Sequence, residues 1–84
     1  MINRQKYGGP TEQIRAEQVQ IGQTVIAVDG GTVRPNQGEW PRVTCRVDHQ
    51  LPIDGHVVEI QLHGRRGALF LRAADTVTIA QEPS

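Results

Sequence analysis

One tryptophan and four arginines have the side chains best suited to recognition in this sequence. The tryptophan lies in the stretch QGEWPR, two arginines follow it closely, and two more stand side by side between glycines in HGRRGAL. Guanidinium groups bind carboxylates and phosphates through planar, paired N–H donors, and tryptophan and arginine are the commonest anchors of protein interfaces. We therefore expect a partner-binding surface that contains Trp40, Arg42, Arg46, Arg65 and Arg66.

Each of these side chains also has a structural explanation that needs no partner. Gly64 and Gly67 can adopt positive φ, so a tight turn with two water-facing residues between them explains the arginine pair. Cross-strand pairing with Glu59 explains the two arginines near the tryptophan. The tryptophan itself either covers one end of a core that is poor in aromatic residues or stands exposed as an anchor, and the sequence leaves both interpretations open.

Three histidines lie seven residues apart, at His49, His56 and His63. The first two flank the turn QLPIDG, where Asp48 or Asp54 would complete a weak metal site. A structural zinc site needs four ligands in a tetrahedral array, and no third strong ligand is evident here. Surface histidines are therefore favoured, and we expect neither a metal nor another cofactor.

Nucleophilic and phosphate-binding motifs are absent from the sequence. The one serine is the last residue, Ser84, and there is neither a G-x-x-x-x-G-K-[ST] nor an H-E-x-x-H stretch. The single cysteine, Cys45, excludes an internal disulfide, and its alternation with Val43 and Val47 predicts a buried, inert thiol. We expect a protein that is not an enzyme.

Composition limits both the size of the core and the kind of partner. The chain has 84 residues, of which 37% are hydrophobic, and its aromatic residues are one tryptophan, one tyrosine and one phenylalanine. A chain of this length forms one domain, and its core must be aliphatic. Nine basic residues balance nine acidic ones, which disfavours general nucleic-acid binding. Eight of the nine basic residues are arginines, a bias that suggests a GC-rich genome, such as that of an actinobacterium or one of its bacteriophages.

The location expected from the sequence is cytoplasmic. No apolar run approaches the roughly 20 residues that cross a bilayer. The first residues are polar and run into Gly8-Gly9-Pro10, so they lack the apolar stretch of a signal peptide.

Alternating apolar and polar residues predict short β-strands along most of the chain. The prediction divides it into a flexible arm at 1–13, an all-β domain at 14–81 and a tail at 82–84. The clearest strands are 42–49, 56–63, 68–72 and 76–80, separated by turns rich in glycine, proline and aspartate. The residues expected to point into the core are Val43, Cys45, Val47, Val58, Ile60, Leu62, Val77 and Ile79.

The stretch 11–22 has two interpretations. It forms either a helix that ends at Gly22, or a short strand at 14–16 followed by a turn that tucks Val19 and Ile21 inward. We favour the β interpretation because Val19 falls off the helical face and the β-branched run QTVIAV follows directly.

The order of these elements resembles that of the SH3-like small barrels, including the KOW and Tudor-like groups. The resemblance rests on the opening stretch VQIGQTVIAVDGG, a long early loop, a central hairpin and the single turn AAD before a last strand. At the opening those barrels commonly have Gly-Asp, and this sequence departs from them with Gly22-Gln23. The resemblance covers most of 14–80 and implies an SH3-like antiparallel barrel of five or six short strands, whose long loops flank a partner groove.

Three functions follow as hypotheses. The first is a non-catalytic interaction module that binds a protein partner through the five residues named at the outset. The second is nucleic-acid binding by the same basic side chains, as in some KOW-like and Tudor-like barrels. The third is self-association through an open strand edge, because small barrels often leave a strand unpaired.

Overall fold

The computed structural model describes residues 7–29, 31–33, 35, 39–53 and 55–81. It is built from β-strands and one 3-10 turn, η1, so the all-β prediction is confirmed. The elements in chain order are β1 (Thr11–Arg15), η1 (Ala16–Gln18), β2 (Val25–Val28), β3 (Gly31–Thr32), β4 (Val43–Leu51), β5 (Gly55–Leu62), β6 (Ala68–Arg72) and β7 (Thr76–Ala80).

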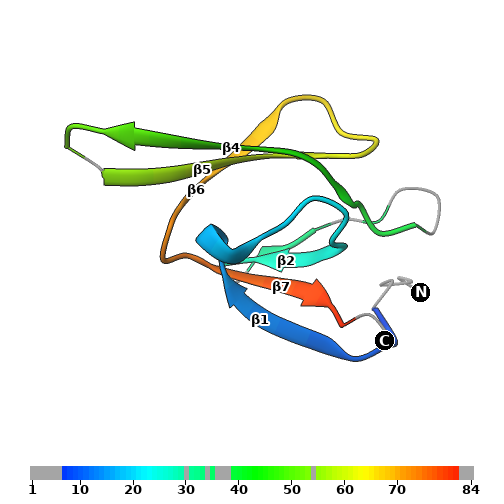
Figure 1. The fold of residues 1–84 in the computed structure, drawn as a ribbon. Helices are drawn as coiled ribbons and strands as arrows, with labels where there is room; N and C mark the ends of the chain where they lie inside the picture. The colour runs from blue at the N-terminus through cyan, green and yellow to red at the C-terminus, as the bar shows by residue number, and fades with distance from the viewer. Residues whose placement is uncertain (1–6, 30, 34, 36–38, 54, 82–84) are drawn as a thin grey trace.

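The strands form two antiparallel sheets rather than one closed barrel within the described ranges. The first has the order β1-β7-β2-β3 and the second the order β4-β5-β6. They lie as two layers, and the β4–β5 hairpin reaches well past the edge of the other sheet (Figure 1). The last strand, β7, lies between β1 and β2, so the two ends of the domain pair with each other.

Backbone hydrogen bonds join the two sheets where the chain enters β4. The amide of Val43 donates to the carbonyl of Gln23 at 2.8 Å, and the amide of Val25 donates to the carbonyl of Pro41 at 2.9 Å. On the other side, the amide of Ala16 donates to the carbonyl of Asp75 at 2.8 Å. The first two bonds fix residues 41–43 against residues 23–25 at the start of β2, which positions the site described below.

The core between the layers is aliphatic, as the composition requires. No aromatic side chain belongs to it, and no polar or charged residue is buried among those described. Its inward-pointing residues on β5 and β7 are the predicted ones, since Val58, Ile60, Leu62, Val77 and Ile79 are all buried. Further members of the cluster are Ala16, Val19, Val25, Val33, Val43 and Leu71.

The stretch 11–22 is a strand followed by turns, so the helical alternative is wrong. The strand begins at Thr11 rather than Ile14, which places 11–13 in the first sheet instead of the predicted arm. Val19 is buried as expected, but Ile21 is 66% exposed, because it lies in the turn before Gly22, whose φ is +96°. Residues 1–6 and the predicted tail at 82–84 lie outside the described residues.

A β-bulge in β4 overturns part of the predicted alternation. Val43 pairs with Leu62 and Cys45 with Gln61, so Thr44 is an extra residue in the strand. After a bulge the side chains exchange faces relative to a regular strand. Beyond Thr44 it is therefore Arg46 that lies opposite the buried Ile60.

Two predicted core residues are corrected by this bulge. Val47 lies opposite Glu59 on the outer face of the second sheet and is 40% exposed. Cys45 lies on the same face and is half-buried, so it does not belong to the core. Of the three β4 residues expected inside, only Val43 is buried.

Candidate functional site

Trp40 lies at the junction of the two sheets, just before the chain enters β4. Its ring packs edge-on against the ring of Tyr7, with centroids 6.0 Å apart and an interplanar angle of 83°. Trp40 is half-buried and lies outside the aliphatic core cluster, while the following Pro41 is buried. Contact with Tyr7 and the hydrogen-bonded backbone at Pro41 therefore restrict the position of the tryptophan, and part of its surface faces solvent.

Arg42 is held beside it by backbone pairing on two sides. It forms a β-bridge with Thr24, and its carbonyl accepts a hydrogen bond from the amide of His63 at 2.9 Å. The side chain is exposed, and within the described part of the chain it makes no ion pair. This arginine is thus a positioned cation rather than a member of a local salt bridge.

Two surface hollows meet at Trp40 and Arg42. The larger has a volume of about 460 Å³, with apolar walls from Ile21, Trp40 and Pro41 and polar groups from Glu39, Arg42 and His63. The smaller, of about 390 Å³, is lined by Tyr7, Trp40 and Ala80 together with polar residues that include Arg42. Both volumes fall within or near the range of roughly 300–1,000 Å³ that is common for ligand sites.

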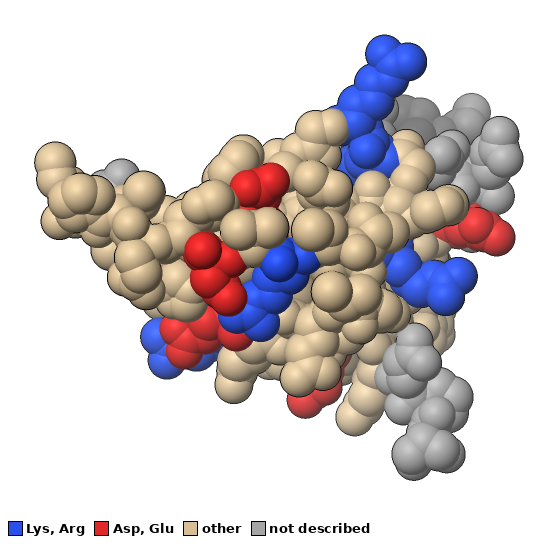
Figure 2. All heavy atoms as spheres, turned by 45° about the horizontal axis from the view of Figure 1, so that its top comes forward, with Lys and Arg blue, Asp and Glu red and all other residues tan. Residues whose placement is uncertain are grey.

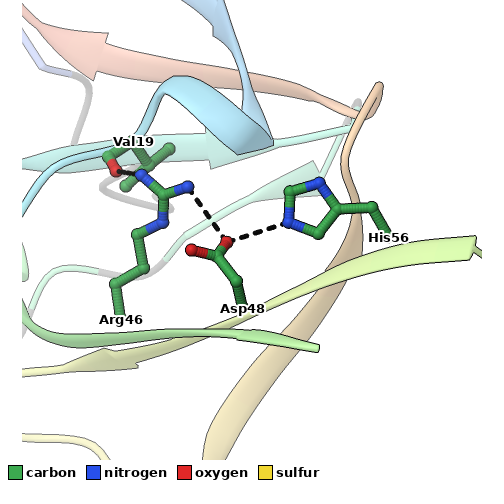
Figure 3. A network of polar contacts seen from close by, with 4 residues as sticks. All are labelled: Val19, Arg46, Asp48 and His56. Atoms are coloured by element: carbon green, nitrogen blue, oxygen red, sulfur yellow. Dashed lines mark hydrogen bonds and ion pairs between the residues drawn. The ribbon is translucent and has the colours of Figure 1, made fainter. Parts of the chain in front are cut away.

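Arg46 is turned away from this surface and forms a polar network on the inner face of the second sheet (Figure 3). Its Nη1 donates to the carbonyl oxygen of Val19 at 2.7 Å, and its Nη2 donates to Oδ1 of Asp48 at 3.0 Å. His56 Nε2 lies 3.0 Å from the same carboxylate oxygen and acts as the donor, because a carboxylate only accepts. These hydrogen bonds, first from His56 and then from Arg46, lower the pKa of Asp48 below its ordinary value of 3.8.

The network ties the β4–β5 hairpin to the segment that follows β1. Val19 is fully buried and sits just after η1, so its carbonyl oxygen needs a partner inside the molecule. Arg46 supplies that partner across 27 residues of sequence. The predicted cross-strand pair between Arg46 and Glu59 does not form, because the bulge places the two residues on opposite faces.

Arg65 and Arg66 lie in the exposed loop between β5 and β6. Gly64 and Gly67 have φ values of +79° and +80°, as the turn explanation requires. Arg65 borders a third hollow, of about 600 Å³, that contains Thr44, His63 and Phe70. This hollow shares Thr44 and His63 with the larger one beside Trp40, so the arginine loop is its neighbour.

The histidines that flank the hairpin turn do not face each other. His49 Nε2 lies 2.8 Å from Oε1 of Glu59 on the outer face, and its ring lies beside Phe70 with centroids 6.3 Å apart. His56 belongs to the inner network instead. Among the described residues, no three His, Cys, Asp or Glu side chains are grouped so that they could hold a metal ion. Asp54, the other suggested ligand, lies outside these residues.

Sequence reasoning missed two participants in these arrangements. The sequence prediction places Tyr7 in the flexible arm, and only its contact with Trp40 identifies it as the support of that ring. Ile53, at the turn of the β4–β5 hairpin, is 94% exposed, although the residue pattern assigns it no role. Its place in QLPIDG, between a proline and an Asp-Gly pair, is the one signal that puts an apolar side chain at a turn.

The five predicted recognition residues therefore separate into three groups. Trp40 and Arg42 share one surface, Arg65 and Arg66 lie on the neighbouring loop, and Arg46 lies on the inner face.

No helix in the described ranges has the length and apolar character needed to span a membrane. Comparison of the chain with protein-family models, curated proteins and solved structures finds no match.

Proposed function

We propose that this protein is a non-catalytic interaction module, acting in the cytoplasm, that binds a protein partner at the surface around Trp40 and Arg42. The observation that carries the proposal is the placement of a half-buried tryptophan, supported by Tyr7, beside an exposed arginine at the meeting point of two hollows. Tryptophan, tyrosine and arginine dominate the binding energy of protein interfaces when they are pre-positioned next to pockets.

The shape and charge of the larger hollow indicate the chemistry of the partner. Its apolar walls fit one aliphatic or aromatic side chain, and the guanidinium of Arg42 at its edge fits a carboxylate. Glu39 on the same rim disfavours a partner with several negative charges. The partner segment we infer has one apolar anchor and one acidic group.

The distribution of charge supports a protein partner over a nucleic acid. Basic and acidic side chains alternate over the surface shown in Figure 2, with no continuous basic stripe on that face. A nucleic-acid surface typically gathers its Lys and Arg side chains on one face to follow the phosphate backbone. Arg65 and Arg66 are then a second, peripheral contact of the same partner.

The SH3-like resemblance is part of the proposal. It is supported by the short turn at 73–75 directly before the last strand, β7, an order that the resemblance implies. In such barrels the long loops often flank the partner groove, and Trp40 lies in the connection between β3 and β4.

A displayed library of random peptides, selected on the immobilised protein, tests the proposal. Selected peptides are expected to contain an apolar residue close to an acidic one, and to bind at least about tenfold more weakly to Arg42→Glu and to Trp40→Ala. Arg72→Glu is the matched control, because Arg72 is an exposed arginine that borders neither hollow at Trp40.

Three results would contradict the proposal. One is that no peptide binds the folded wild-type protein; another is that selected peptides bind all three variants equally. The third is tight binding of a labelled oligonucleotide that weakens steeply with salt, because counterion release marks a nucleic-acid site. Thermal melts of each variant establish that the loss of binding does not come from unfolding.

A further inference from the structure

The tip of the β4–β5 hairpin is an exposed apolar knob. Leu51, Pro52 and Ile53 are all exposed, and Ile53 retains 94% of its accessible surface. The hairpin carries this tip beyond the rest of the molecule, at the left of Figure 1. Figure 2 shows the same projection without any basic side chain at its end. Exposed aliphatic residues gathered at a protruding end mark a site of interaction.

Charge around the knob favours a protein pocket over a lipid surface. The sequence from 47 to 64 contains no lysine or arginine, and the next residue in the sequence after Ile53 is an aspartate. Anionic lipids attract basic segments and repel acidic ones, so this tip lacks the charge for a membrane surface. An apolar pocket with a cation on its rim matches it instead.

The larger hollow at Trp40 has these properties. Its lining includes the apolar side chains of Ile21, Trp40 and Pro41, the guanidinium of Arg42, the carboxylate of Glu39 and the ring of His63. Its volume of about 460 Å³ accommodates the small side chains of a hairpin tip. Ile21 is 66% exposed beside it, which extends the apolar surface that a knob would cover.

Within one molecule, the Leu51–Ile53 tip cannot reach the hollow at Trp40. The hollow includes Val43 at the start of β4, and the knob begins at Leu51 at the end of the same strand. Eight residue steps of an extended strand span roughly 26 Å. The two surfaces therefore lie at opposite ends of one rigid strand, and only a second molecule can bring them together.

We propose that the protein self-associates head to tail, with the Leu51–Ile53 tip of one copy seated in the Trp40 hollow of the next. The proposal rests on the proposed function, since it names a second copy of this chain as the partner of the same surface. The contact joins different surfaces of identical chains, so it repeats into an open chain of molecules or closes into a ring. The contact is small, so the association is weak at low concentration.

Sedimentation velocity with two complementary variants tests this geometry. The wild-type average mass should rise with chain concentration between about 10 µM and about 1 mM. Ile53→Asp disables the knob and Arg42→Glu disables the hollow, and each variant alone should associate at least about tenfold more weakly. A one-to-one mixture of the two should form pairs and nothing larger, because only one knob and one hollow remain intact in that combination.

Ile21→Asp is a second hollow variant, and Phe70→Thr is the matched control. Phe70 is 63% exposed on the outer face of the second sheet and belongs to neither surface, so its substitution should leave the association unchanged. If instead Phe70→Thr abolishes the association, or the mixed variants stay monomeric while the wild type associates, the head-to-tail contact is wrong.

The remaining outcomes separate this inference from the proposed function. A wild type that stays monomeric at about 1 mM, while selected peptides still bind the hollow, overturns self-association alone. Binding to phosphatidylserine-containing vesicles that depends on Ile53 overturns it as well, and identifies the tip as a lipid contact. Self-association that needs the tip but is unaffected by both hollow variants contradicts the assignment of the hollow.

Discussion

Arg42 and Arg46 are four residues apart, and they have opposite environments. Arg42 is exposed beside Trp40 and has no ion pair among the described residues, whereas Arg46 reaches the inner face to bind the Val19 carbonyl and Asp48. Regular strand alternation would give the two arginines the same face, and the bulge at Thr44 separates them. The same residue type is therefore exposed at the proposed recognition surface at one position and joins internal segments at the other.

The two faces of the second sheet show the same division for histidine. His56 donates to Asp48 on the inner face, where the network continues through Arg46 to a buried segment. His49 pairs with Glu59 on the outer face beside the exposed Phe70. Both histidine pairs lie within the β4–β5 hairpin, so it is the bond from Arg46 to the Val19 carbonyl that links the inner network to a distant segment.

The largest expected effect distinguishes the two arginines by stability. Arg46→Met keeps an apolar stem but removes the donors to Val19 and Asp48, and it should lower the free energy of unfolding by about 1.5–3 kcal/mol. Arg42→Met should change it by no more than about 0.5 kcal/mol, as for other surface substitutions. Urea titrations of both variants measure the difference. Equal effects would contradict the separation of the two roles.

An intermediate effect is expected for the support of Trp40. A double-mutant cycle with Tyr7→Leu and Trp40→Leu should give a coupling energy of about 0.5–1.5 kcal/mol, the usual value for an edge-on aromatic pair. Thermal unfolding of the wild type, the two single variants and the double variant measures this coupling energy. A coupling near zero would mean that Tyr7 does not hold the tryptophan, and the pre-positioned anchor would lose its physical basis.

The smallest effect concerns pH and the inner network. Because the folded pKa of Asp48 lies below its ordinary value of 3.8, the carboxylate stabilises the fold at pH values above 3.8. This stabilisation is lost as the pH falls through the folded pKa. The wild type should therefore exceed Asp48→Asn in stability at pH 7, and the difference should shrink below pH 3.8. Denaturation at stepped pH values checks this, and a constant difference would contradict it.

The sequence predicted the strands better than the site. Period-2 alternation correctly identified the inward residues of β5 and β7, because both strands are regular along their length. It failed in β4, where one extra residue reverses the faces and no residue type marks the bulge. It also assigned Tyr7 to an arm, since a contact across 33 residues leaves no local pattern.

The sequence by itself determined that the protein is all-β with an aliphatic core, because few aromatic residues and short alternating runs leave no other way to bury apolar surface. It also determined the turn at Gly64 and Gly67, since positive φ is a local property of glycine. Only the tertiary structure decided which arginine faces outward and which chain segments flank Trp40. Both depend on register and on contacts between distant segments, which the local pattern of residues does not encode.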